Sequence, residues 1–287
     1  MQHRSSEELP WSFATMDEFR SFMRWRAGRR PFILAHRGAP GAECAENSLD
    51  AYERAWVAAP CWAEVDIRTT RDGAFVLNHD ATLDRCTTGS GPLAARTLSE
   101  LRDLRLRDIG GLPTDQRMMT FDEAIDWARG RTVLFLDIKE GRARFADVLR
   151  HVRRRGAHLF CVTLTYAIQD TLAVHGIAPE AMVYGRATNE AFADELVGSG
   201  IPHDRLVAWI HDETPPSVFE RLHAEGILTT YGTFIEVDRR AVREGFAPYH
   251  ERLARGADIL NSDDVPRAAA AIDTFRAAHG PARRDTE

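Results

Sequence analysis

Short apolar runs alternate with helical patterns along almost the whole 287-residue chain. This alternation is typical of repeated β-α-β units, in which the strands lie parallel in one sheet. The runs that predict strands are Phe32–Ala35, Ala63–Thr69, Thr132–Ile138, Leu159–Leu164, Met182–Gly185, Leu206–Ile210, Ile227–Thr230 and Ile259–Asn261. The helical patterns cover Leu49–Ala58, Phe121–Ala128, Arg144–Arg154, Tyr166–Val174, Glu190–Val197, Ser217–Ala224, Arg239–Arg255 and Pro266–Ala278.

Eight predicted strands, each followed by a helix, favour a closed (β/α)₈ TIM barrel of the α/β class over an open, doubly wound sheet. One such barrel typically takes about 250 residues, which suits this chain, although its length alone also allows two average domains. Between Asp80 and Thr120, stretches rich in Gly, Thr and Pro interrupt the pattern. We therefore expect a small insertion at about residues 80–120, after the second strand.

The two ends of the chain are expected to lie outside the barrel proper, which takes residues 31–279. In the N-terminal extension, residues 1–30, Thr15 and Glu18 predict a capping box, and apolar residues follow at helical spacing. We expect this helix to plug the bottom of the barrel. The alternative is a helix that uses nearby arginines to bind a membrane surface or a partner. Residues 280–287 are expected to form a flexible tail.

The composition argues against several classes of protein. The longest apolar runs fall far short of the roughly 20 residues that a membrane helix needs, and the first residues mix acids with bases, unlike a secretory signal. We therefore expect a cytoplasmic protein without a transmembrane segment. The net charge of −6 argues against a nucleic-acid binder. The four cysteines lack the paired spacing of zinc sites and disulfide frameworks, so free thiols are expected.

The chain uses arginine almost exclusively as its basic residue. Of 37 Lys and Arg residues, 36 are Arg, and the one lysine is Lys139. Arginine can replace lysine on a surface, where both merely carry charge, but not where a compact ammonium is required. Since Lys139 lies two residues after Asp137 at the end of an apolar run, it is a candidate site residue. Retention by chance is the alternative.

Polar residues follow several predicted strands directly, at the end of the barrel where active sites gather. They are His36 and Arg37 after the first strand, Glu64 and Asp66 in the second, His79 after the run Phe75–Leu77, and Asp137 and Lys139 at the end of the third. Residues two apart in a strand point to one face, and in a barrel that face is the interior. Three inward acids would be unstable as bare charges, so we expect one divalent cation, Mg²⁺ or Ca²⁺, on Glu64, Asp66 and Asp137.

Each of these residues taken alone also has a structural explanation. A histidine after a strand, or a carboxylate paired with an arginine, occurs in ordinary ion-pair networks. Convergence of several polar groups at successive strand ends favours a functional site instead.

The first half of the chain carries longer motifs around these residues. They are His36-Arg37-Gly38, Ala45-Glu46-Asn47-Ser48, Glu64-Val65-Asp66, Thr70–Asp80 and Leu83-Asp84-Arg85-Cys86-Thr87. In order and spacing these motifs resemble the glycerophosphodiester phosphodiesterase family. The resemblance implies a TIM barrel and metal-dependent cleavage of a phosphodiester. It further implies a role for each candidate: His36 and His79 as general acid and base, Glu64, Asp66 and Asp137 as metal ligands, and Arg37 and Lys139 as phosphate contacts.

The chain departs from the family pattern in three places. Asp137 stands where glutamate is more usual, which is similar to the more distantly related spider-type sphingomyelinase D branch. In the second half, Thr229-Thr230-Tyr231-Gly232 and Ile259-Leu260-Asn261-Ser262-Asp263 differ from the family's runs near the last two strands. Those strand ends would line the pocket for the alcohol. The sequence therefore indicates cleavage of a phosphodiester but does not identify the alcohol.

These observations favour a metal-dependent phosphodiesterase that hydrolyses glycerophosphodiesters, or a related small phosphodiester, to an alcohol and a phosphomonoester such as glycerol 3-phosphate. One alternative is a lyase or transferase on the same barrel, which forms a cyclic phosphate or a new phosphodiester. The other is a barrel that only binds phosphorylated ligands, which the presence of both histidines and all three acids disfavours. The expected partner is a small-molecule phosphodiester, and no oligomeric state is indicated.

A substitution of Lys139 tests whether this lysine has a chemical role or is retained by chance. If the ammonium of Lys139 contacts phosphate beside the metal, Lys139→Arg should impair turnover although the charge is kept, because a guanidinium is larger, planar and differently directed. We expect kcat/KM to fall about tenfold or more, measured with metal saturating, and the melting temperature to stay unchanged. Unaltered kinetics would remove Lys139 from the site.

Overall fold

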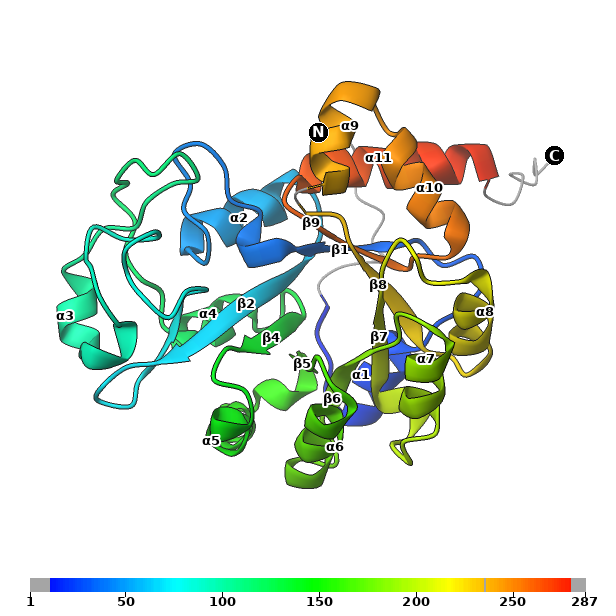
Figure 1. The fold of residues 1–287 in the computed structure, drawn as a ribbon, viewed down its shortest axis with the longest axis horizontal. Helices are drawn as coiled ribbons and strands as arrows, with labels where there is room; N and C mark the ends of the chain where they lie inside the picture. Colours follow the sequence, from blue (N-terminus) through cyan, green and yellow to red (C-terminus); the bar gives the residue numbers. More distant parts are fainter. Residues whose placement is uncertain (1–10, 235, 280–287) are drawn as a thin grey trace.

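Eight parallel strands close into a barrel in the computed structural model, which describes residues 11–234 and 236–279 (Figure 1). The strands of the barrel are β1 (Phe32–Ala35), β2 (Trp62–Thr69), β4 (Leu134–Ile138), β5 (Cys161–Leu164), β6 (Met182–Arg186), β7 (Leu206–Ile210), β8 (Leu228–Gly232) and β9 (Ile259–Ser262). Each pairs in parallel with the next, and β1 pairs with both β2 and β9, which closes the ring. The TIM barrel expected from the sequence pattern is confirmed.

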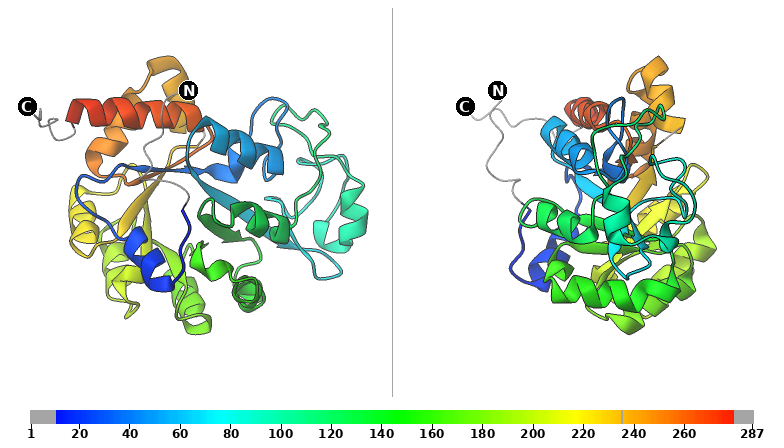
Figure 2. Two further views of the ribbon diagram at one scale, coloured as in Figure 1. Left: turned by 180° about the vertical axis from the view of Figure 1, so that it is seen from behind. Right: turned by 90° about the vertical axis from the view of Figure 1, so that its left-hand side faces the viewer.

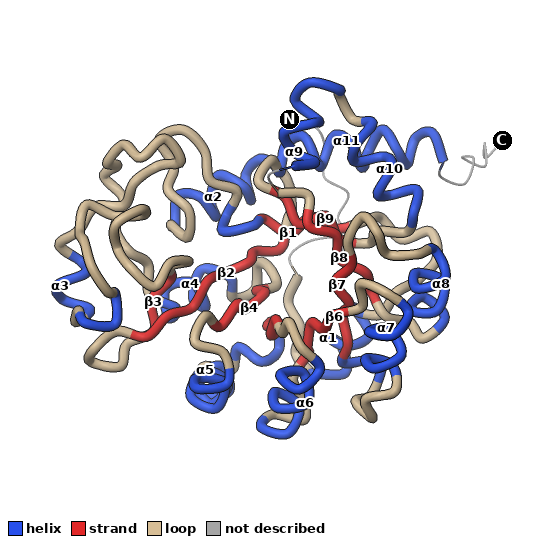
Figure 3. Tube along the Cα trace, viewed as in Figure 1, coloured by secondary structure: helices blue, strands red, loops and turns tan. Residues whose placement is uncertain are grey.

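Helices follow the strands and surround the barrel (Figure 3). They are α2 (Leu49–Ala58), α4 (Phe121–Ala128), α5 (Arg142–Arg154), α6 (Ile168–Ile177), α7 (Glu190–Val197), α8 (Pro216–Ala224), α9 (Glu236–Glu244), α10 (Ala247–Arg255) and α11 (Val265–His279). The prediction of one helix over Arg239–Arg255 is wrong. The chain breaks there into α9 and α10 because Gly245 is left-handed, with φ +71°, and Pro248 lies in the first turn of α10.

Side chains along the strands alternate between the barrel interior and the surrounding helices. At the N-terminal ends, the interior residues form a continuous apolar layer of Leu34, Trp62, Phe135, Val162, Met182, Val207, Leu228 and Ile259. Two residues further along six of these strands, the same face becomes polar or aromatic: His36, Glu64, Asp137, Tyr184, Trp209 and Asn261 follow Leu34, Trp62, Phe135, Met182, Val207 and Ile259. The site therefore lies at the C-terminal ends of the strands, on top of an apolar floor.

Helix α1 (Met16–Met23) lies against that floor and covers the other end of the barrel, as seen from behind in Figure 2. Its Phe19 and Met23 are buried in the apolar layer. The hydroxyl of Thr15 accepts a hydrogen bond from the backbone N–H of Glu18, which caps the helix. The Glu18 carboxylate bonds to the N–H of Ala14 rather than Thr15, so only half of the predicted capping box forms.

The chain leaves the barrel between β2 and β4 (Figure 1). Strand β3 (Phe75–Leu77) pairs antiparallel with β2, and the 3₁₀ turn η2 (Leu93–Ala95) and helix α3 (Leu98–Arg102) follow. This excursion has a small core, formed by Leu83, Leu93, Leu101, Leu106 and Met118 together with Ala45 and Val76. Further 3₁₀ turns are η1 (His36–Gly38), η3 (Ala157–Leu159) and η4 (His203–Arg205).

Several expectations concern properties of the whole chain. All four cysteines are buried and unpaired, as expected of free thiols. Across the described ranges, no helix has the length and apolar character needed to cross a membrane. The limits of the N-terminal extension, barrel and insertion stay predictions. The expected tail, residues 280–287, and the first ten residues of the extension lie outside the described residues.

Candidate active site

A cavity of about 420 Å³ opens at the C-terminal ends of the barrel strands. All seven site residues predicted from the sequence line it: His36, Arg37, Glu64, Asp66, His79, Asp137 and Lys139. The remaining lining residues are Leu164, Tyr166, Tyr184, Trp209, Ile210, His211, Tyr231, Gly232, Phe234 and Asn261. One side of the cavity, from β1 through β4 and their loops, is therefore charged, and the other, from β5 through β9, is largely aromatic.

Glu64, Asp66 and Asp137 form a buried group of carboxylates on two neighbouring strands. They are 3%, 1% and 5% exposed, and each offers an oxygen within 4.8 Å of the other two. The register of β2 with β4 sets Asp66 opposite Asp137 and places Glu64 one inward position earlier. This arrangement of carboxylate oxygens could bind a divalent metal ion.

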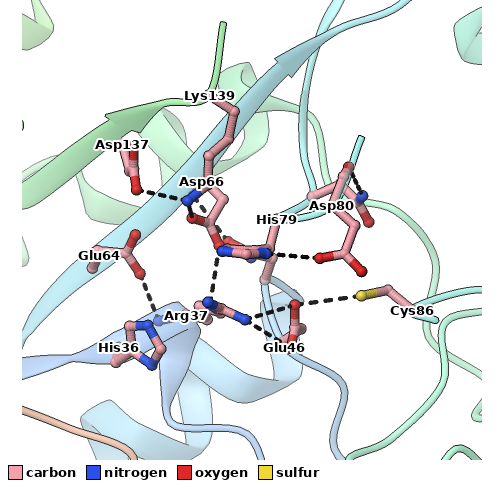
Figure 4. Close-up of polar contacts among 12 residues, drawn as sticks. His36, Arg37, Glu46, Glu64, Asp66, His79, Asp80, Cys86, Asp137 and Lys139 are labelled. Carbon is pink, nitrogen blue, oxygen red and sulfur yellow. Dashed lines mark hydrogen bonds and ion pairs between the residues drawn. The ribbon is translucent and has the colours of Figure 1, made fainter. Parts of the chain in front are cut away.

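Lys139 and Arg37 offset part of this negative charge (Figure 4). The Nζ of Lys139 lies 2.7 Å from Asp66 Oδ1 and 2.6 Å from Asp137 Oδ2, and Arg37 Nε lies 3.4 Å from Asp66 Oδ2. Burial alone would raise the pKa of Asp66, but the two cations hold it below its usual value. Burial would likewise lower the pKa of Lys139, but the carboxylates raise it. The one lysine of the chain thus lies inside the carboxylate group.

Glu64 is the least compensated of the three acids. Its Oε2 accepts a hydrogen bond from the backbone N–H of Arg37 at 2.9 Å, and within the described residues no side-chain cation lies at ion-pair distance from it. Burial, and then the charges of Asp66 and Asp137, raise the pKa of Glu64 well above its usual value. A bound cation would remove this repulsion, so the residues present fit a metal ion.

The loop between β1 and α2 is tightly wound and reaches back to the acids. Four of its residues other than glycine have a positive φ, of 51° to 61°, which is uncommon and held by surrounding contacts: Arg37, Ala39, Glu43 and Asn47. Asn47 donates from Nδ2 to Asp66 Oδ2 at 2.7 Å and accepts from the Asp66 N–H at 3.1 Å. A Cβ on Gly38 would lie 2.8 Å from that of Ala51, so the loop requires glycine there.

Both cavity histidines are held by an aspartate at the ring atom Nδ1. His36 Nδ1 lies 2.8 Å from Asp263 Oδ1, and His79 Nδ1 lies 2.7 Å from Asp80 Oδ1. The ring of His36 also stacks on Phe234, with 4.0 Å between the ring centroids. Because a carboxylate accepts the proton of Nδ1–H, the second nitrogen, Nε2, of each ring is left to exchange a proton at the cavity.

Arg85 connects the two sides of the charged network. Its guanidinium donates to both oxygens of Asp80, at 2.7 and 2.9 Å, and to both oxygens of Glu46, at 2.8 Å each. Glu46 in turn lies 3.3 Å from Arg37 Nη1. The hydrogen bonds from Arg85 hold the pKa of Asp80 well below its usual value. The Arg85 guanidinium therefore holds both Asp80, the partner of His79, and Glu46, the partner of Arg37.

Most of the residues that hold the site in place were not predicted from the sequence. Glu46, Asn47 and Arg85 lie inside the motifs that carried the resemblance, so motif position was the available signal. Asp263 lies 227 residues from His36, and only the closed ring brings them together. The prediction that α6 begins at Tyr166 is wrong: Tyr166 precedes the helix and donates a hydrogen bond to Asp137 Oδ2 at 2.6 Å.

Comparison with known proteins places the chain among related barrels. The model of the glycerophosphoryl diester phosphodiesterase family matches residues 36–196, more than half of the chain and all seven predicted site residues. The chain belongs to this family. It is 35% identical over 144 residues to glycerophosphodiester phosphodiesterase 1 of Mus musculus, an alignment that covers 48% of this chain and 42% of that protein. The chain spans less than half the length of the curated relatives it matches.

Solved structures extend the likeness to the complete barrel. A glycerophosphoryl diester phosphodiesterase from Parabacteroides distasonis has a TM-score of 0.83 and 28% identity, with 92% of this chain and 93% of that chain covered. A phosphodiesterase from Oleispira antarctica, solved in complex with the product sn-glycerol-3-phosphate, has a TM-score of 0.70 and 20% identity, with 89% and 99% covered. The second likeness shows the fold alone.

Arg85 donates to both oxygens of Asp80 and of Glu46, so its loss should destabilise the fold more than the loss of a single surface ion pair. Arg85→Met leaves Glu46 and Asp80 without their shared donor, so we expect the free energy of unfolding to fall by about 1–3 kcal/mol, measured by urea titration with an unchanged slope. Arg85→Lys should restore less than half of the loss because an ammonium cannot fork onto both carboxylates.

Arg102→Met is the matched control for this experiment. Arg102 is exposed to about the same extent as Arg85, but its one partner, Glu123, is 51% exposed, whereas Glu46 and Asp80 are 12% and 27% exposed. Loss of Arg102 should therefore cost less than about 1 kcal/mol. Equal losses in Arg85→Met and Arg102→Met would contradict the bracing role.

Proposed function

We propose that this chain is a metal-dependent phosphodiesterase that hydrolyses glycerophosphodiesters, or a closely related small phosphodiester, to an alcohol and a phosphomonoester such as glycerol 3-phosphate. The observation that carries the proposal is the convergence of three carboxylates, two aspartate-held histidines and two cations in one cavity. Membership of the family supports the reaction class. The Oleispira antarctica phosphodiesterase of the same fold was solved with sn-glycerol-3-phosphate, the product that we propose for this chain.

In this proposal Glu64, Asp66 and Asp137 hold one divalent cation, Mg²⁺ or Ca²⁺, because all the ligand atoms are carboxylate oxygens. A bound cation supplies positive charge to the phosphoryl oxygens. Arg37 and Lys139 line the same cavity and contact the phosphate as fixed cations. Together they offset the charge that develops on the phosphoryl group.

His36 and His79 serve as the general acid and base. The Nε2 of one ring accepts a proton from the attacking water while a new P–O bond forms, and the Nε2 of the other donates a proton to the departing alkoxide as its P–O bond breaks. Asp263 and Asp80 hold the rings in the tautomer that leaves Nε2 available. Attack by a substrate hydroxyl instead of water would give a cyclic phosphate, which ³¹P NMR distinguishes from a phosphomonoester.

Removal of metal tests the role of the carboxylates. We expect excess EDTA to abolish turnover of glycerophosphocholine and of bis(4-nitrophenyl) phosphate, and Mg²⁺ or Ca²⁺ to restore it, because the three acids otherwise repel one another. The same cation should raise the melting temperature of the wild type by binding the native state and do so less for Glu64→Gln. Glu123→Gln, an exposed acid outside the cavity, should respond like the wild type. Full turnover in EDTA with metal shown to be absent would refute the assignment.

Substitution of each histidine tests proton transfer. We expect His36→Ala and His79→Ala each to lose about 10²-fold or more in kcat with the fold intact, the scale of general acid-base catalysis. The loss should shrink for a diester with a good leaving group in the variant that lacks the acid, which identifies that residue. His151→Ala is the control, since His151 forms a similar pair with Asp122 outside the cavity. Near wild-type rates in both cavity variants would rule the pair out.

A further inference from the structure

The aromatic side of the cavity differs from the charged side in its hydrogen-bonding groups. The carboxylates that line the cavity all come from β2 and β4, and none comes from β5 through β9. Two acids that follow strands on that side are already engaged: Asp212 after β7 with Arg252, and Asp263 after β9 with His36. A group of the substrate on this side therefore meets no lining carboxylate.

Arg186 stands at the rim of this side. It is the last residue of β6, two positions after the cavity residue Tyr184, so it continues the inward-facing row of that strand. Its guanidinium carbon lies 3.7 Å from the ring centroid of Phe192 and 5.7 Å from that of Trp209, and its Nε donates to Thr188 Oγ1 at 3.1 Å. These contacts fix the guanidinium in place.

Arg186 is charged but has no carboxylate partner. Among the described residues no acid lies at ion-pair distance from it, although many of the chain's other arginines form such pairs. Its terminal nitrogens, Nη1 and Nη2, donate no hydrogen bond within the described part of the chain. A positioned guanidinium with unused donors is the group that proteins use to bind carboxylate or phosphate.

Two side chains of the cavity wall also have hydrogen-bonding atoms that no described residue contacts. The carboxamide of Asn261, which is 7% exposed and lines the cavity, makes no side-chain hydrogen bond to any described residue. His211 accepts the backbone N–H of Glu213 at Nδ1, which leaves the N–H at Nε2 without an acceptor in the described chain. The wall thus offers polar groups that a substrate with several acceptor oxygens would satisfy.

From these contacts we propose that the alcohol esterified to the phosphate carries a second anionic group, a carboxylate or a phosphate, which Arg186 binds at the rim. This inference rests on the proposed function and names the substrate class of the same site. The diester phosphate lies against the carboxylate group and its cations, and the alcohol extends along the aromatic side toward Arg186.

The aromatic rings alone would favour the opposite charge. Faces of Trp and Tyr bind cations such as quaternary ammonium groups, and Tyr166, Tyr184, Trp209 and Tyr231 all line the cavity. However, Arg186 already lies near the Trp209 ring, and no lining acid on this side offsets its charge. A cationic head group would therefore face a fixed guanidinium, whereas an anionic one would pair with it.

A series of three substrates with the same chain length tests this inference. They are sn-glycero-3-phosphodiesters of 3-hydroxypropanoate, 1,3-propanediol and 3-aminopropanol, which carry an anionic, a neutral and a cationic end. We expect the wild type to favour the anionic over the cationic diester by about tenfold or more in kcat/KM, the lower end of what a hydrogen bond to a charged group contributes. The ratio does not depend on the fraction of enzyme that is folded.

Variants of Arg186 assign the preference to this residue. Arg186→Met keeps an unbranched stem on Phe192 and should reduce the ratio to near one, and Arg186→Glu should reverse it. Arg153→Met is the control, since Arg153 is an exposed arginine of α5 that pairs with Glu180 away from the cavity, and it should keep the wild-type ratio. Arg186→Lys should keep part of the preference, because charge remains but the fork is lost.

The outcomes separate this inference from the proposed function. Turnover of all three diesters at equal kcat/KM, or an unchanged ratio in Arg186→Met, overturns the inference and leaves the phosphodiesterase intact. Preference for the cationic diester likewise overturns it. Absence of turnover for all three diesters and for bis(4-nitrophenyl) phosphate with metal present contradicts both.

Discussion

The close approach of three buried carboxylates on β2 and β4 governs the rest of the site. Parallel pairing leaves Glu64, Asp66 and Asp137 no room to separate, because their positions follow from strand register rather than from flexible loops. Buried like charges are unstable unless each meets a cation or a donor. The surrounding structure supplies part of this compensation. Lys139 touches Asp66 and Asp137, and Arg37 lies near a second oxygen of Asp66. The Asn47 amide and the Tyr166 hydroxyl donate to the same two acids, whereas among the described residues Glu64 accepts only the backbone N–H of Arg37.

The need to compensate the three carboxylates also explains features that look unrelated in the sequence. The loop after β1 adopts left-handed backbone at residues with functional side chains, since Arg37 and Asn47 must both turn back toward Asp66. Lys139 brings one compact ammonium within 2.7 Å of both Asp66 and Asp137, a contact for which lysine is better shaped than the larger, planar arginine that the chain uses elsewhere. Local strain and an unusual residue choice are thus both consequences of the same crowding of charge.

Much of this arrangement could be predicted from the sequence, for a physical reason. Buried parallel strands are short apolar runs, and polar residues that follow them must gather at one end of a barrel. Contacts that depend on closure of the ring were not predictable in the same way. Asp263 has no local pattern that links it to His36, and Tyr166 continues an apparently helical stretch although it faces Asp137. The break at Gly245 was missed because the apolar period continues across it.

The pairing of β1 with β9 has a consequence for the nascent chain. The carboxylate group is complete once β2 and β4 have paired, but the aspartate that orients His36 comes from the segment after β9, 227 residues further along the chain. A fragment released early in synthesis, or an intermediate with an open ring, carries the acids and lacks a correctly oriented first histidine. The charged half of the cavity therefore needs only the β2–β4 pair, whereas the orientation of the His36 ring needs the closed ring of strands.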